Sequence, residues 1–382
     1  MERYYINVSD EILQDLKNRL KNTRWPDQVL NSEWEYGTSL DNLKELIKYW
    51  INDFNWKKQE SKLNEIPQYI SKIDGMNIHF VYKQGKGPNP IPIIATSGWP
   101  SSFAEMYEII DLLTNPNNYG FDSTDSFDVI VPSIPGFGFS DKPIQKGTLQ
   151  VDNIWRKLMI EVLGYKNFIA HGTDIGARIT SALGRFHKDV VLGIHIGSVD
   201  LEWPDPLPQI SSLSENEKNY LERVKNWEKY QGAYASIQST YPQTVAYGLN
   251  DSPAGLASWI LEKFYLWSDC NGNIETRFSK DILLTNIMIY WITETINSSM
   301  RRYYEAFHNF NKNPLKLGER IEVMTAIAMF PGEKELVVPK EWAERCYNII
   351  QWTDMQSGGH FPALEEPLLL AEDIILFAKN FR

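Results

Sequence analysis

Residues 167–177 predict a buried strand, a sharp turn and the beginning of a helix. Apolar residues lead into the turn, where Gly172 and Gly176 flank Asp174 in the pattern small-x-nucleophile-x-small. This spacing is typical of a nucleophile elbow, in which the turn exposes one side chain at the end of a sheet. Many hydrolases carry a serine at this point. An aspartate predicts attack by a carboxylate through an alkyl-enzyme ester rather than serine acyl transfer.

Strand-like runs alternate with helical patterns along the middle and end of the chain. The runs span residues 78–82, 92–96, 127–132, 168–170, 191–195 and 323–328. This alternation predicts an α/β fold, with a mostly parallel central sheet that helices cover on both faces. Because ligands of open α/β sheets bind at the carboxyl ends of the strands, we expect Asp174 at a ligand site.

The 382 residues divide into four predicted segments. Residues 1–75 predict a helical N-terminal extension that packs on the core. Residues 76–200 and 311–382 supply the first and last parts of the α/β core. Residues 201–310 lack strand patterns and are dense in aromatic residues, which predicts a helical lid over the carboxyl edge of the sheet.

Composition argues against several classes of partner and location. The net charge of −11 disfavours nucleic acid, because phosphate binding requires clustered Lys and Arg. No secretory signal is visible at the start, and no run of about 20 apolar residues predicts a membrane span. Cys270 and Cys346 form neither a disulfide framework nor a metal-ligand cluster. Free thiols are consistent with a cytoplasmic protein.

A glycine-flanked histidine, His360, follows a short apolar run that predicts the last strand. Taken alone, His360 is equally compatible with an ordinary loop residue. Hydrolysis of an alkyl ester needs a base that activates water, so the elbow upstream makes His360 the candidate general base.

An acid that orients His360 is expected after the strand at residues 323–328. Glu333 and Glu335 both lie in the loop that follows it. The order aspartate, glutamate, histidine matches the nucleophile–acid–base order of α/β-hydrolases. Glu333 lies closer to the strand end and is preferred, while Glu335 remains the alternative.

The loop at residues 97–100 is the candidate for one side of an oxyanion hole. In this fold the hole takes one backbone N–H from this loop and one from the residue after the nucleophile. These donors are Trp99 and Ile175, and they would bind the non-attacking carboxylate oxygen of Asp174. The spacing alone is equally compatible with a structural turn.

Several unusual motifs in order resemble those of epoxide hydrolases of the microsomal type. The resemblance covers nearly the whole chain and rests on residues 22–27 (NTRWPD), 35–38 (EYGT), 98–100 (GWP), 132–140 (PSIPGFGFS), 242–253 (PQTVAYGLNDSP) and 358–361 (GGHF). It implies opening of an epoxide to a vicinal diol without a metal or organic cofactor. It also implies that Asp174 is the nucleophile, that His360 activates water and that Glu333 is the acid.

The resemblance further implies that two tyrosines of the lid bind the epoxide oxygen. They match Tyr234 and Tyr303, with Tyr304 as the neighbouring alternative to the second. Phenols can donate hydrogen bonds to an ether-like oxygen and protonate a departing alkoxide. The aromatic lid predicts a bulky apolar epoxide, a small-molecule partner, as substrate, and the N-terminal helical arm could support a homodimer.

Three departures from the family pattern concern the neighbourhood of Asp174. Where the family usually has His-Gly-Trp-Pro-Gly, this chain has the residues SGWPS at positions 97–101. Ser97 therefore replaces a histidine, and Ser101 replaces a glycine. Ile175 stands where a tryptophan often follows the nucleophile. Compared with the family pattern, the segment from Phe330 to Trp342 contains what looks like one extra residue. For this reason Glu335 remains the alternative acid.

Two other functions are weighed against epoxide hydrolysis. Haloalkane dehalogenation also uses an elbow aspartate, but it needs halide-stabilising donors, often an indole N–H beside the nucleophile, which Ile175 cannot supply. A catalytically silent small-ligand binder of the same fold has no need for a nucleophile–base pair such as Asp174 and His360.

Overall fold

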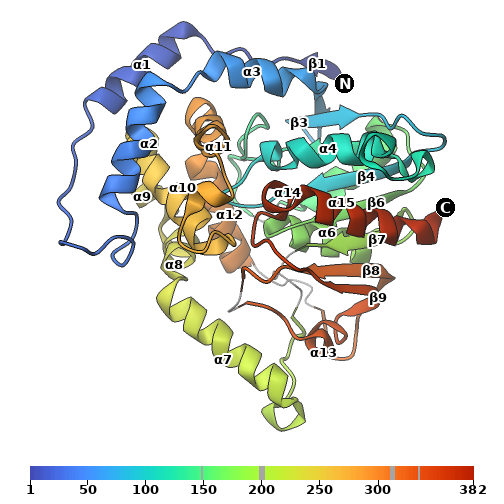
Figure 1. Cartoon of the computed structure of the whole chain (residues 1–382). Helices are drawn as coiled ribbons and strands as arrows, with labels where there is room; N and C mark the ends of the chain where they lie inside the picture. The colour runs from blue at the N-terminus through green and yellow to red at the C-terminus, as the bar shows by residue number, and fades with distance from the viewer. Residues whose placement is uncertain (148, 198–202, 310–314, 334–335) are drawn as a thin grey trace.

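The computed structural model describes residues 1–147, 149–197, 203–309, 315–333 and 336–382 (Figure 1). These residues form a nine-stranded sheet in the order β1-β2-β3-β5-β4-β6-β7-β8-β9. The strands are β1 (Glu2–Tyr4), β2 (Gln68–Ile73), β3 (Met76–Lys83), β4 (Ile91–Thr96), β5 (Phe127–Pro132), β6 (Phe168–Gly172), β7 (Val191–Ile196), β8 (Ile321–Met329) and β9 (Tyr347–Asp354). From β5 to β9 all neighbours pair in parallel. The mostly parallel sheet confirms the predicted fold class.

The central strands are apolar along almost their whole length. β5 and β6 are buried at every residue. Parallel strands that helices cover on both faces carry such continuous apolar runs, because neither face meets water. The sheet therefore buries the end of β6, which Asp174 follows two residues later.

Strands β1 and β2 form an antiparallel edge that the sequence analysis did not predict. β2 and β3 are joined by Asp74 and Gly75, whose φ angles are 50° and 84°. Positive φ at both residues is the requirement of a type I′ hairpin turn, for which Asp-Gly is a preferred pair. The Asp-Gly pair was not interpreted as a hairpin turn because the residues before it have a helical pattern.

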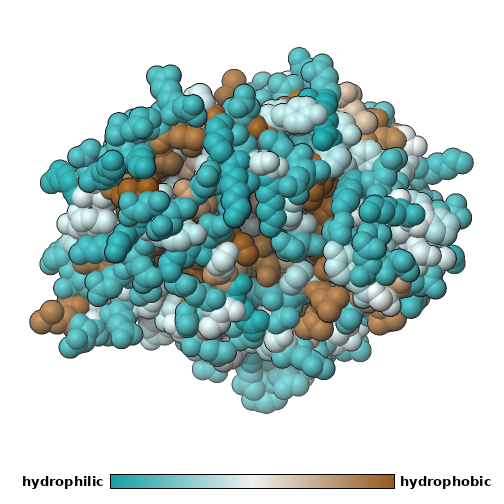
Figure 2. Space-filling view, turned by 45° about the horizontal axis from the view of Figure 1, so that its top comes forward, coloured by the Kyte–Doolittle hydropathy of each residue, from teal (hydrophilic) through white to brown (hydrophobic). Residues whose placement is uncertain are grey.

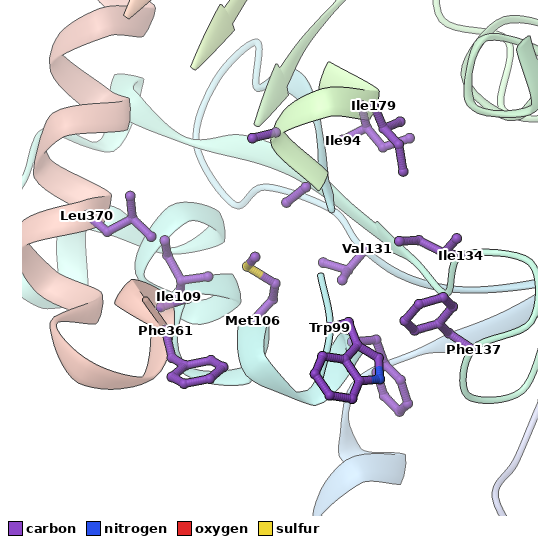
Figure 3. Close-up of a cluster of buried hydrophobic side chains, with 14 of the residues drawn as sticks. Ile94, Trp99, Met106, Ile109, Val131, Ile134, Phe137, Ile179, Phe361 and Leu370 are labelled. Carbon is purple, nitrogen blue, oxygen red and sulfur yellow. The ribbon is translucent and has the colours of Figure 1, made fainter. Parts of the chain in front are cut away.

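Helices cover both faces of the sheet. On one face α4 (Tyr107–Thr114) packs with α14 (Pro362–Glu365) and α15 (Pro367–Ala378), and on the other α5 (Val151–Lys157) packs with α6 (Ile175–Phe186). Figure 3 shows part of this core, with Ile94 of β4 beside Ile179 of α6 and with Phe361 near Ile109. The short helix α13 (Lys340–Ala343) precedes β9.

Between β7 and β8 the described chain is helical. The helices are α7 (Glu215–Tyr230), α8 (Ala233–Thr240), α9 (Pro242–Asp251), α10 (Pro253–Trp267), α11 (Lys280–Thr293) and α12 (Ile296–Asn309). Serine side chains cap several of them, and Ser214 and Glu217 form a complete capping box at the start of α7. In Figure 1 α8 to α12 lie together beside the sheet, while α7 extends away from them.

The N-terminal helices α1 (Asp10–Lys21), α2 (Leu40–Asn52) and α3 (Trp56–Glu65) arc around α9, α10 and α11 (Figure 1). The loop between α1 and α2 contacts α10 closely. Trp34 stacks on Tyr265 with ring centroids 3.8 Å apart, and the Thr38 hydroxyl donates to the Ser258 carbonyl at 2.7 Å. The N-terminal segment thus touches the helical segment as well as the sheet.

Hydrophilic side chains cover most of the face drawn in Figure 2, with hydrophobic groups interspersed among them. This distribution is ordinary for a protein of high net charge in water. In the part of the chain that the structure describes, no helix combines the length and the apolar character needed to cross a bilayer.

Candidate active site

Asp174 lies in a tight turn between β6 and α6. Its φ of 51° and ψ of −127° are unusual for a residue with a side chain, as expected at a strained elbow. A Cβ atom on Gly172 would lie 2.2 Å from the Gly176 carbonyl oxygen, and one on Gly176 would lie 1.9 Å from the Thr96 oxygen. Both glycines are therefore required, because the turn packs directly on itself and on the end of β4.

The loop after β4 binds the Asp174 carboxylate. The Trp99 N–H donates to Asp174 Oδ1 at 2.8 Å, which places a backbone donor where an oxyanion hole needs one. Gly98 makes this approach possible, since a Cβ atom there would lie 2.0 Å from Asp174 Oδ1. Ile175 is the first residue of α6, and the first N–H groups of a helix have no partner within it. The structure gives no hydrogen bond between its N–H and Asp174.

His360 lies between the Asp174 carboxylate and an acid. Its Nε2 is 3.4 Å from Asp174 Oδ2, and its Nδ1 is 2.5 Å from Glu333 Oε1. The histidine comes from the loop after β9 and Glu333 from the loop after β8, so neighbouring strand ends bring them together. Glu335, the alternative acid, falls outside the described residues.

Two carboxylates determine the protonation of His360. Burial lowers the pKa of His360, but the charges of Glu333 and Asp174 outweigh burial and raise this pKa well above its ordinary value. An imidazolium between two carboxylates is the expected resting form. Conversion of Asp174 to a neutral ester would remove one of these charges and lower the pKa of His360.

Both predicted tyrosines contact Trp99, the residue whose N–H binds Asp174. The Tyr234 ring stacks on the Trp99 ring at 5.3 Å, and the Tyr303 ring meets Trp99 edge-on at 5.9 Å. The two phenol rings are 5.9 Å apart. Tyr304 lies on the more exposed side of α12 and packs on His308 instead. The geometry therefore brings Tyr303, and not Tyr304, to Trp99.

Two residues of α10 complete this cluster and were not singled out from the sequence. The Trp267 ring contacts Tyr234 at 5.1 Å and His360 at 4.8 Å. Lys263, one helical turn earlier, is buried with its Nζ 4.5 Å from the Tyr234 ring centroid. Burial lowers the pKa of Lys263, which Glu262 partly offsets. The sequence signal that could have indicated Lys263 is its position within a largely apolar helical run.

The candidate site is closed in this structure. The Asp174 side chain is 14% exposed and the His360 side chain 9%, so little of either meets solvent. A groove of about 1020 Å³ lies elsewhere, between the N-terminal strand and the loop at residues 138–147. None of the candidate catalytic residues lines it.

Comparisons with known proteins identify the family of this chain. The family model described as epoxide hydrolase N terminus matches residues 1–106, and the model described as alpha/beta hydrolase fold matches residues 91–249. Epoxide hydrolase 1 of Oryctolagus cuniculus is 36% identical to the chain, over 98% of the chain and 88% of that protein.

Solved structures give the same result. Juvenile hormone epoxide hydrolase from the silkworm Bombyx mori superposes with a TM-score of 0.84 and 30% identity, covering 100% of this chain and 94% of that one. Aspergillus niger epoxide hydrolase has a TM-score of 0.85 and 28% identity, covering 99% and 96% of the two chains. Sequence identity and fold agree over the whole length, and the chain belongs to the epoxide hydrolase family.

Proposed function

We propose that this chain hydrolyses epoxides to vicinal diols through a covalent ester on Asp174. One observation carries the proposal. The Asp174 carboxylate has one oxygen on a backbone donor, at Trp99, and the other facing His360. A carboxylate held in this way can attack with the free oxygen, and the bound oxygen is already in place for the later anionic intermediate.

In the first proposed step the epoxide oxygen accepts hydrogen bonds from Tyr234 and Tyr303. Asp174 Oδ2 attacks a ring carbon, and the bond between that carbon and the epoxide oxygen breaks. The resulting alkoxide takes a proton from one of the two phenols. The products of this step are a hydroxyalkyl ester of Asp174 and a tyrosinate.

In the second proposed step His360 removes a proton from water, and the hydroxide attacks the Asp174 carboxyl carbon. The Trp99 N–H stabilises the negative charge that develops on Oδ1. Collapse breaks the bond from this carbon to Oδ2, which leaves with the diol and takes the proton from His360. The regenerated carboxylic acid then loses its proton, and the tyrosinate is reprotonated. Glu333 keeps the imidazole oriented and stabilises its positive charge.

The helices of residues 201–310 are proposed to act as a lid over this site. Tyr234 and Tyr303 both belong to them, and their aromatic neighbours Trp99 and Trp267 are apolar surfaces. These walls favour an apolar epoxide as the small-molecule substrate. A homodimer, a cytoplasmic location and independence of nucleic acid remain predictions from the sequence.

The proposed function is tested by incubating the protein with a panel of alkyl and aryl epoxides in ¹⁸O-labelled water. We expect vicinal diols, and after several turnovers label in the peptide that contains Asp174, because water attacks the carboxyl carbon. In a single turnover the diol should carry no label. Label that enters the diol at once and never reaches Asp174 would show direct attack by water and contradict the covalent route.

Replacing Tyr303 with phenylalanine should slow formation of the ester by roughly 10- to 100-fold, the effect of losing a hydrogen bond to a charged group. The residual rate reflects Tyr234, which still binds the epoxide oxygen. Stopped-flow or quenched single turnovers measure this step. Tyr304→Phe is the matched control on the next residue of α12 and should leave the rate unchanged. An equal loss in both variants would contradict the assignment.

A further inference from the structure

The loop that carries His360 lies against the end of α10, a helix of the proposed lid. The His360 N–H donates to the Trp267 carbonyl at 3.0 Å, and the Gly358 N–H donates to Asp269 Oδ2 at 3.2 Å. A Cβ atom on Gly359 would lie 2.6 Å from the same Trp267 oxygen. The two segments are therefore in direct contact, and glycine is required between them.

A single buried carboxylate, that of Glu365, also connects the His360 loop to the residues after α10. Glu365, at the end of α14, is 8% exposed. Its Oε1 accepts from the Phe361 N–H at 3.0 Å, and its Oε2 accepts from the Asp269 N–H at 2.7 Å. Phe361 directly follows His360 in the chain. Because buried N–H groups need an acceptor, both ends of this bridge are firmly held.

We propose that Glu365 is a positioning residue for the base: it fixes the loop of His360 to the end of α10, so that the lid and the base keep one relative position. This inference rests on the function proposed above. Glu365 acts through the backbone of Phe361 and Asp269 and does not touch the reacting atoms.

The chemical sequence gives this role a distinct signature. His360 is needed as a base only for hydrolysis of the ester, whereas formation of the ester depends on Asp174 and the tyrosines. A shift of the His360 loop changes the separation of His360 Nε2 and Asp174, now 3.4 Å from Nε2 to Oδ2. Misplacement of a catalytic group by about 1 Å is enough to slow a reaction strongly. Loss of Glu365 should therefore affect the second step selectively.

The test is Glu365→Gln with styrene oxide as the probe. Glutamine offers one acceptor oxygen and turns an amide N–H toward the other backbone N–H, so one end of the bridge is lost. We expect ester hydrolysis to slow by roughly 10- to 100-fold while ester formation changes little. Rapid quench gives both rates, and intact mass shows the ester accumulating during turnover.

Glu60→Gln is the matched control. Glu60 is also buried, and its Oε2 accepts from the Val8 N–H at 2.7 Å, but it lies in α3, outside the proposed active site. This variant should lose thermal stability without changing the ratio of the two rates. If Glu365→Gln does not fold, Glu365→Asp keeps the carboxylate on a shorter side chain that cannot reach both backbone N–H groups, and it should shift the ratio in the same direction.

Two outcomes would overturn the assignment. Either both rates fall equally in Glu365→Gln, or only its melting temperature falls and the ratio stays that of the wild type. Failure of the proposed function gives a different result, because the wild-type protein would then form no ester with any epoxide.

Discussion

Replacing His360 with glutamine should trap the protein as its ester on Asp174. Glutamine cannot accept a proton from water, so we expect hydrolysis of the ester to slow by roughly 10²- to 10⁴-fold. Ester formation needs the Asp174 carboxylate and should persist, since removing the neighbouring imidazole leaves the Trp99 N–H in place. Intact mass spectrometry after mixing with an epoxide should show an adduct equal to the mass of the substrate.

His187→Gln is the control for this variant. His187 Nε2 is 3.1 Å from Asp152 Oδ2, so it also pairs with a carboxylate, but it lies at the far end of α6 from Asp174. Its replacement should give no adduct and an unchanged turnover. An unmodified His360→Gln protein that still turns over at the wild-type rate would show that another group activates the water.

The same histidine predicts how the two steps depend on pH. The charges of Glu333 and Asp174 keep the pKa of His360 well above its ordinary value in the free protein. The ester removes the Asp174 charge, so the pKa of His360 falls and the neutral, basic form becomes available. Hydrolysis measured on the preformed ester should therefore reach its plateau at a lower pH than titration of His360 in the free protein.

The proximity of Asp174, Glu333 and His360 was largely predictable because Asp174 and His360 sit in local patterns. Asp174 lies between two glycines after an apolar run, and His360 follows two glycines after the last strand. In a parallel sheet, residues after consecutive strands meet at one edge, so the order along the chain already indicates proximity. The contact of His360 with Glu333 follows from this rule.

The features that could not be predicted from the sequence depend on how the helices pack. Tyr303 and Tyr304 are adjacent, and only the orientation of α12 decides which one faces Trp99. Lys263 and Glu365 are ordinary charged residues in the sequence. Lys263 is buried against Tyr234 of α8, and Glu365 is buried where it binds the N–H groups of Asp269 and Phe361. Both environments include contacts between segments distant along the chain.

Asp174→Asn should abolish formation of the ester, and this is the largest effect we expect. The neutral amide is a poor nucleophile, and loss of the covalent route should lower diol formation by about 10⁴-fold or more, an activation barrier higher by at least ~5.4 kcal/mol. The asparagine oxygen can still accept a hydrogen bond from the Trp99 N–H, so the turn should keep its conformation. A diol or amide ligand should therefore bind to the variant as it does to the wild type.

Asp152→Asn is the matched control, because Asp152 also faces a histidine, His187, away from the elbow. Its diol formation should equal that of the wild type. Mass spectrometry of the peptide that contains position 174 must verify that the introduced asparagine has not deamidated to aspartate, since a small deamidated fraction would mimic residual activity. Unreverted Asp174→Asn that still forms diol at the wild-type rate would exclude Asp174 as the nucleophile. Water would then have to attack the epoxide directly. Without an ester intermediate, Trp99 would have no role as an oxyanion donor.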